Sequence, residues 1–142
     1  GRGCLGRPWL FADLVAAFSG TQSKALPTLF EVREVMYRHG ELIVDYFENE
    51  DRGCRDLRKH MAWYLKGFRV NSEMRRQFGM VGSLAELRGL LDQLDDQPYP
   101  VEVSEKPRGR TSHGRPVTLP DGWLLDPNEI VEIELEDMFS GG

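Results

Sequence analysis

Five segments predicted to be helical, joined by short connections, constrain the fold of this chain more than any other feature. Apolar residues recur at helical spacing along 8–19, 29–49 and 52–67. Asn71 or Ser72 can cap a short fourth helix near 73–79, and Ser83 a last helix at 84–95. Thr28 and Ser83 each stand three residues before a glutamate, which is the spacing of a capping box at a helix start. Because amphipathic helices this close in sequence bury their apolar faces against one another, we predict a mainly α fold, a compact helical bundle of four to five helices.

The chain changes character after Asp96. Six prolines interrupt any further helix: Pro98, Pro100, Pro107, Pro116, Pro120 and Pro127. We therefore predict a helical domain over 8–96 and a Pro-rich acidic C-terminal extension over 97–142. Apolar and acidic residues alternate over 131–136, and a turn sequence at 120–122 stands between two apolar triplets, so a short β-hairpin is expected there.

Length and cysteine content limit the class of protein. At 142 residues the chain can bury one core and carry a tail. It opens at Gly1, without Met and inside a Gly-rich turn, so we expect a longer natural polypeptide. Cys4 and Cys54 have no C-x-x-C spacing, which predicts neither a zinc site nor a disulfide. With no apolar run of about 20 residues, we expect a soluble protein of the reducing cytoplasm, without a membrane partner.

The charges are unevenly distributed along a chain whose net charge is -5. Residues 51–79 hold eight Lys/Arg against three Asp/Glu, a local net charge of +5, whereas 1–50 and 80–142 carry -2 and -8. We call residues 51–79 the basic island. Because binding of a polyanion depends on the local field, the island permits a nucleic-acid partner that the overall charge would disfavour.

The predicted third helix lies within the basic island and is buried along one face. The candidates for RNA binding are its basic residues, one histidine and two arginines downstream: Arg55, Arg58, Lys59, His60, Lys66, Arg75 and Arg76. A helix that is anchored by one face and basic on another can lie along a phosphate backbone. On charge alone, a solvated surface face is the more common explanation of such a run.

Three ring-bearing residues of the same helix have structural alternatives. His60 could act as an acid, a base or an RNA contact, but a single histidine between core and surface more often has a structural role. Trp63 and Tyr64 could stack on bases, but aromatic residues at helical spacing usually pack in a core. We predict no catalytic residue and no metal site in this chain.

The chain begins with a Gly-rich turn that leads into the first predicted helix at Pro8. Backbone N–H groups at a helix start, together with the helix dipole and a nearby arginine, suit a phosphate group. Such a turn often follows the last strand of a barrel enzyme and holds a cofactor phosphate, so residues 1–7 are predicted to be the remnant of a barrel phosphate-binding loop. The alternative is that the glycines only permit a tight turn. Cys4 has no partnering base nearby in sequence and is not predicted to be a nucleophile.

Two blocks, in this order and at this separation, carry a family resemblance. The run 1–11, from Gly1 to Phe11, resembles the segment after the last barrel strand in tRNA-dihydrouridine synthases. The run 57–67, from Leu57 to Gly67, resembles the signature helix of their C-terminal domain. The resemblance covers residues 1–95 and is closest to bacterial members, and the extension is similar to those of actinobacterial members.

The resemblance implies a flavin-dependent oxidoreductase with an N-terminal barrel that binds FMN and a C-terminal helical domain, with tRNA lying across both. Such enzymes reduce the C5–C6 bond of a uridine in tRNA, with NADPH as the source of electrons. Position by position, Gly1 and Arg2 match the FMN-phosphate loop, and Arg58, Lys59 and His60 match the tRNA-facing motif. The catalytic cysteine of the family belongs to a barrel loop without counterpart here, so the chain alone is expected to be inactive.

Two other hypotheses remain open at this point. The chain could be a helical protein-interaction module whose basic face contacts an acidic partner or its own acidic tail. It could also be a fragment of another phosphate-binding barrel enzyme, in which the helical bundle only packs.

Overall fold

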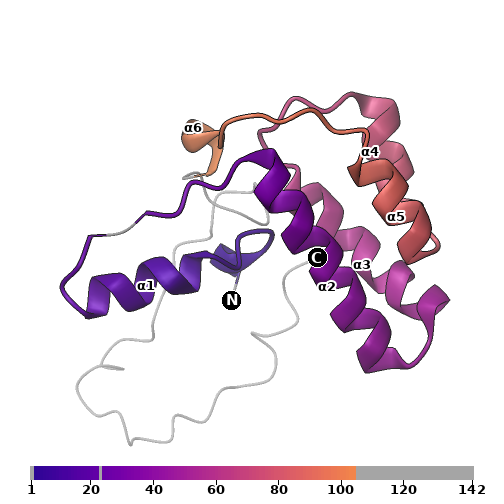
Figure 1. Cartoon of the computed structure of the whole chain (residues 1–142), viewed down its shortest axis with the longest axis horizontal. Coiled ribbons are helices and arrows are strands. Elements are labelled where there is room, and N and C mark those ends of the chain that lie inside the picture. The colour runs from indigo at the N-terminus through magenta and orange to yellow at the C-terminus, as the bar shows by residue number, and fades with distance from the viewer. Residues whose placement is uncertain (1, 23, 105–142) are drawn as a thin grey trace, which may run out of the picture. The chain divides into compact units, whose positions relative to one another are not determined.

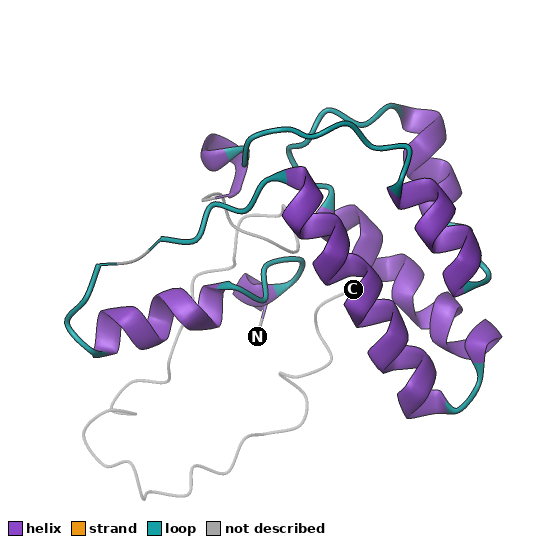
Figure 2. Ribbon diagram, viewed as in Figure 1, coloured by secondary structure: helices purple, strands orange, loops and turns teal. Residues whose placement is uncertain are grey.

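The computed structural model describes residues 2–22 and 24–104. The chain divides into two units between Thr111 and Ser112, and every described residue belongs to the first. Its elements are the short 3-10 helix η1 (Arg2–Cys4) and the helices α1 (Leu10–Phe18), α2 (Leu29–Phe47), α3 (Glu50–Tyr64), α4 (Ser72–Phe78), α5 (Leu84–Leu91) and α6 (Val101–Ser104) (Figure 1). The described part is helices and loops without a strand, which confirms the mainly α prediction (Figure 2). The predicted hairpin lies outside the described residues.

Side-chain caps begin four of the helices. Thr28 forms a complete capping box, because its hydroxyl accepts from the N–H of Glu31 and the Glu31 carboxylate accepts from the N–H of Thr28 at 2.7 Å. Asn49 caps α3 by accepting from the N–H of Arg52 at 2.9 Å, and Asn71 caps α4 in the same manner. Each cap satisfies a donor that the first helical turn leaves without an intrahelical partner.

Several predicted helix limits and one capping box are corrected. The helix expected over 52–67 begins at Glu50, because Asn49 caps it, and ends at Tyr64, so Lys66 lies in the following turn where Gly67 has a φ of 88°. The last helix ends at Leu91 and not at 95. Ser83 accepts from the N–H of Glu86, but the Glu86 carboxylate binds the N–H of Gly82, so the second box is not reciprocal.

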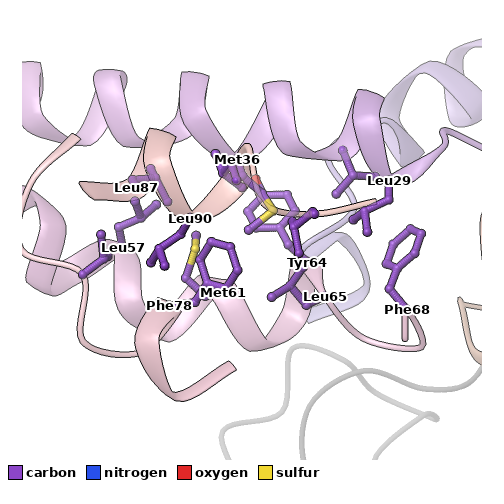
Figure 3. Packing of buried hydrophobic residues seen from close by; sticks show 14 residues of the cluster. Leu29, Met36, Leu57, Met61, Tyr64, Leu65, Phe68, Phe78, Leu87 and Leu90 are labelled. Atoms are coloured by element: carbon purple, nitrogen blue, oxygen red, sulfur yellow. The ribbon is translucent and has the colours of Figure 1, made fainter. Parts of the chain in front are cut away.

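The core lies where α2, α3, α4 and α5 meet (Figure 3). Its fully buried side chains come from all four helices and from the loops that follow α3 and α4: Leu29, Val32, Met36, Leu57, Met61, Leu65, Phe78, Val81, Leu87 and Leu91. Burial of each such side chain stabilises the fold by about 1.5–3 kcal/mol. The bundle therefore has a single core, and α3 contributes one face to it while its opposite face meets solvent.

Two buried glycines let the helices approach closely. A Cβ at Gly40 would meet the methyl groups of three leucines, the nearest on Leu84 at 3.0 Å. A Cβ at Gly53 would lie 2.8 Å from the Cα of Val44. The missing side chain of Gly40 makes room for these leucines.

Residues 96–99 contact several parts of the bundle through hydrogen bonds and aromatic rings. The side-chain amide of Gln97 pairs with the backbone of Arg69, accepting from its N–H at 2.8 Å and donating to its carbonyl at 3.0 Å. The Asp96 carboxylate accepts from the N–H of Phe30 at 3.0 Å. The Tyr99 ring stands edge-on to those of Phe68 and Trp9, at centroid distances of 6.0 and 5.8 Å. The start of the predicted extension thus contacts α2, the α3–α4 loop and the N-terminal turn.

Helix α1 is the least buried of the long elements. Within the described part of the chain none of its residues is buried, and Phe18 is 91% exposed. Its Asp13 carboxylate accepts from the N–H of Ala25, in the loop that follows the helix, at 2.8 Å. The turn before it packs on α3, since a Cβ at Gly6, whose φ is 64°, would lie 2.4 Å from the carbonyl carbon of Trp63. That approach requires glycine.

Candidate RNA-binding face

Two basic residues of α3 point to solvent one helical turn apart. Arg55 and Lys59 are exposed, on the side opposite the buried Leu57 and Met61. The four-residue spacing places both cations on one stripe, as predicted. Together they form one part of the basic island that a backbone of phosphates can reach.

Every acidic residue of the basic island forms an ion pair with one of its basic residues. Arg55 pairs with Asp51 at 2.8 Å, Lys59 with Asp56 at 2.7 Å, and Arg76 with Glu73 at 2.7 Å. The hydrogen bond from Lys59 lowers the pKa of Asp56, and the one from Arg76 lowers the pKa of Glu73. In the first pair the side chains are 67% and 60% exposed. Pairs this exposed contribute about 0–1 kcal/mol, so a phosphate can take the place of the carboxylate.

Two of the predicted RNA-binding arginines make structural hydrogen bonds. The Nε of Arg58 donates to the Val81 carbonyl at 2.9 Å. Arg75 donates to the carbonyls of Leu65, Phe68 and Val70 at 3.0, 2.8 and 3.0 Å. The Arg75 bonds satisfy carbonyls at and after the C-terminus of α3, where the helix leaves acceptors without intrahelical partners, and the Val81 carbonyl bound by Arg58 follows α4. RNA binding by either arginine stays a prediction.

His60 belongs to a row of aromatic rings between α2 and α3. Its ring lies 4.7 Å from that of His39 and 5.2 Å from that of Trp63. Burial lowers the pKa of both histidines, and the positive charge of the nearby Lys59 also acts to lower it. Both imidazoles are therefore neutral at neutral pH and can donate and accept hydrogen bonds.

Tyr64 packs in the core, as the structural alternative predicted. It is 5% exposed, and its hydroxyl forms a hydrogen bond with His39 Nδ1 at 3.1 Å. Burial raises the pKa of its hydroxyl to about 12. Trp63 is half-buried, and its ring stands edge-on to that of His60.

A pocket that the sequence did not indicate lies beside this row of rings. Its volume is about 600 Å³, and its lining comes from the N-terminal turn, α2 and α3. The apolar lining residues are Leu5, Pro8, Val35 and Leu42. The polar ones are Cys4, Glu34, Arg38, His39, His60 and Tyr64. Sequence spacing gives no sign of it, because its three walls are far apart in the chain.

The predicted phosphate-binding turn is described only in part. Gly1 lies outside the described residues, and nothing is described of the side chain of Arg2. The N–H groups that open α1 already donate within the turn: those of Leu10, Phe11 and Ala12 bind the carbonyls of Arg7, Pro8 and Trp9 at 3.1, 3.2 and 3.0 Å. The first turn of this helix thus has fewer N–H groups available for a phosphate than the sequence suggested.

The described residues, 2–22 and 24–104, contain no group of three or more His, Cys, Asp or Glu placed to hold a metal ion. None of the helices in this part of the chain has the length and apolarity to cross a membrane.

Comparison with known proteins identifies the family. Residues 1–100 match the family model described as dihydrouridine synthase (Dus). Over its whole length the chain is 52% identical to a probable tRNA-dihydrouridine synthase of Mycobacterium leprae, and the match covers 37% of that protein. It is likewise 51% identical to a probable tRNA-dihydrouridine synthase of Mycobacterium tuberculosis, of which the match covers 36%. Over 57% of the chain it is 36% identical to tRNA-dihydrouridine synthase B of Pasteurella multocida, covering 24% of that protein.

The matched lengths set the scope of this similarity. The chain spans just over a third of the length of the mycobacterial relatives. The match excludes the hypothesis of a different phosphate-binding barrel enzyme and confirms the resemblance carried by the N-terminal turn and α3. This chain belongs to the dihydrouridine synthase family.

Proposed function

We propose that this chain is the tRNA-binding helical region of a tRNA-dihydrouridine synthase. The full-length enzyme reduces a uridine in tRNA to dihydrouridine, with FMN as the flavin and NADPH as the reductant. Family membership over the whole chain supports this assignment. The flavin chemistry belongs to the part of the enzyme that this chain does not span, and the helical region supplies affinity and orientation.

The exposed cations of α3 carry the proposal. Arg55 and Lys59 lie one turn apart on a helix whose opposite face is in the core, so their position is rigid. Both are held by carboxylates in exposed ion pairs, which a phosphate backbone can replace at little cost. Phosphate contacts of this kind position a nucleic acid without reading its sequence. The helical region therefore sets how the tRNA lies against the catalytic part.

The FMN contact assigned to this chain is a smaller part of the proposal. Gly1 and Arg2 would hold the FMN phosphate, as the match to the family loop suggests. The turn that follows supports a rigid attachment, because Gly6 lies against the backbone of Trp63 and so ties the loop to α3. No catalytic role is assigned to Cys4.

Binding of the 142-residue chain to unmodified tRNA, measured by fluorescence anisotropy over a range of salt concentrations, tests the proposal. We expect the logarithm of the association constant to fall linearly with that of the salt concentration. The variant Arg55→Gln/Lys59→Gln should bind more weakly and reduce the slope by about two, one for each phosphate contact. Asp56→Asn should bind more tightly, because it releases Lys59 from its carboxylate.

Lys24→Gln is the matched control, since Lys24 is exposed on the loop before α2, outside the basic island. It removes one positive charge and should leave the slope unchanged. Equal slopes for the wild type and the α3 double variant would contradict the proposal. The basic face would then be a solvated surface or, if an acidic protein binds it instead, a protein-interaction face.

A further inference from the structure

The pocket between the N-terminal turn, α2 and α3 has no role in the phosphate contacts proposed for α3. Its volume of about 600 Å³ lies within the range of about 300–1,000 Å³ that small-ligand sites occupy. Leu5, Val35 and Leu42 give it apolar walls, and His39 and His60 also line it. We propose that this pocket binds an unstacked nucleobase of a bound RNA strand, an inference that rests on the proposed function.

The lining matches the chemistry of a nucleobase. A base has two apolar faces and an edge that carries both donors and acceptors, and single-stranded bases are recognised by stacking and by hydrogen bonds to that edge. Neutral His39 and His60 each offer one N–H donor and one acceptor nitrogen. His39 uses Nδ1 for the hydroxyl of Tyr64, which leaves its Nε2 for a ligand.

The surroundings of the pocket select a nucleotide over an apolar peptide. Lys59 precedes His60 in α3, and its charge acts on both histidines of the pocket, as does that of Asp56. Arg38 stands on the α2 side of the pocket, in an exposed ion pair with Glu41 at 3.0 Å. A base in the pocket would thus have cations on both flanks for the phosphates that precede and follow it. His60 of the pocket lining directly follows the exposed Lys59 in α3.

Two oligonucleotides with the same phosphates separate base binding from phosphate binding. Hexauridylate and its abasic counterpart, a chain of six ribose phosphates without bases, are titrated against the full 142-residue chain at fixed salt. We expect hexauridylate to bind about tenfold tighter, because stacking on protein rings is sensitive to the base and not to the backbone. The salt dependence of the two should be the same.

The thiol of Cys4 reports directly on the pocket. Cys4 is half-buried in the pocket lining, whereas Cys54 is fully buried and its burial raises its thiol pKa, so N-ethylmaleimide should modify Cys4 selectively. Hexauridylate should slow this alkylation, and the abasic chain should not. Alkylation should in turn abolish the tenfold preference while binding of the abasic chain is unchanged. Cys4→Ser, treated with the same reagent, is the control and should keep the preference.

Each other outcome overturns the inference. Equal, salt-dependent binding of both oligonucleotides without protection of Cys4 would leave a face that binds phosphates only, so the proposed function would stand and the base pocket would fall. Absence of binding by either would reject both. Protection of Cys4 by a rising concentration of the chain itself would identify a second copy as the occupant.

Discussion

Gly53 decides how closely α3 can approach α2. A Cβ at this position would lie 2.8 Å from both the Cα and Cγ2 of Val44, a contact with backbone that no side-chain rotation relieves. We expect Gly53→Ala to lower the free energy of unfolding by about 2 kcal/mol, because overpacking of about 1–3 kcal/mol outweighs the better helix propensity of alanine. Urea unfolding followed by circular dichroism measures the change.

Gly89 provides the matched control, since it also lies inside a helix but nothing would lie within 4 Å of its Cβ. Gly89→Ala should raise the free energy of unfolding by about 0.5–1 kcal/mol through helix propensity alone. If Gly53→Ala stabilises the chain as much as Gly89→Ala, α2 and α3 do not pack as closely at Gly53 as the structure shows.

Single residues divide into those whose role follows from helix periodicity and those whose role depends on a distant partner. The exposure of Arg55 and Lys59 could be predicted, because their angular position on α3 is fixed by the positions of its apolar residues. The bond from Arg58 to the Val81 carbonyl could not, since it spans 23 residues. For the same reason, no spacing rule could place His39 beside His60.

At the scale of elements, Arg75 and Arg76 have opposite roles although they are neighbours in α4. Arg75 donates to three carbonyls around the α3–α4 connection, and Arg76 pairs with Glu73 in solvent. We expect Arg75→Ala to lower the free energy of unfolding by about 2 kcal/mol, because hydrogen bonds from a charged donor are lost at half-buried acceptors. Arg76→Ala should leave it nearly unchanged. Thermal unfolding of both variants tests this contrast.

The same pair also separates two explanations of weaker RNA binding. A loss of binding in Arg75→Ala that parallels a loss of helical signal reflects the fold, whereas a loss in Arg76→Ala at unchanged stability reflects a phosphate contact. Equal melting temperatures for both variants would show that the carbonyl contacts of Arg75 contribute nothing to the α3–α4 connection.

Helix existence was easier to predict than helix limits. The Thr28 capping box and the apolar stripe that follows it specify α2 locally, and the structure confirms both. The limits of α3 depend on Asn49, a cap three residues before the predicted start, and on Gly67, whose positive φ turns the chain beyond the helix. Helix ends are less sharply specified by sequence than helix interiors, because the first and last turns fray.

At the scale of the whole molecule, the sequence predicted which segments form helices but not what holds them together. The pocket needs the N-terminal turn to lie on α3, and that contact depends on a close approach of Gly6 to the backbone of Trp63. The ring of Tyr99 adds a second tie by contacting Trp9. Neither contact leaves a periodic pattern in the sequence, because each joins segments that are more than 50 residues apart.

The predicted boundary at residue 96 therefore has a structural test. A chain that ends at Asp96 lacks the two hydrogen bonds between Gln97 and Arg69 and both ring contacts of Tyr99. We expect it to be less stable by about 3 kcal/mol than a chain that ends at Ser104, from about 1 kcal/mol per hydrogen bond and about 0.5–1.5 kcal/mol per aromatic pair.

Chemical unfolding of the two truncated chains, each compared with the 142-residue chain, decides where the folded unit ends. The double variant Gln97→Ala/Tyr99→Ala in the 142-residue chain should reproduce most of the loss, which separates the side chains from the effect of a new C-terminus. Equal stability of the chains ending at Asp96 and Ser104 would place the boundary at 96, as the proline pattern predicts. A loss confined to the shorter chain would make residues 97–99 part of the helical domain, because they join its N-terminal turn to the bundle that carries the basic face.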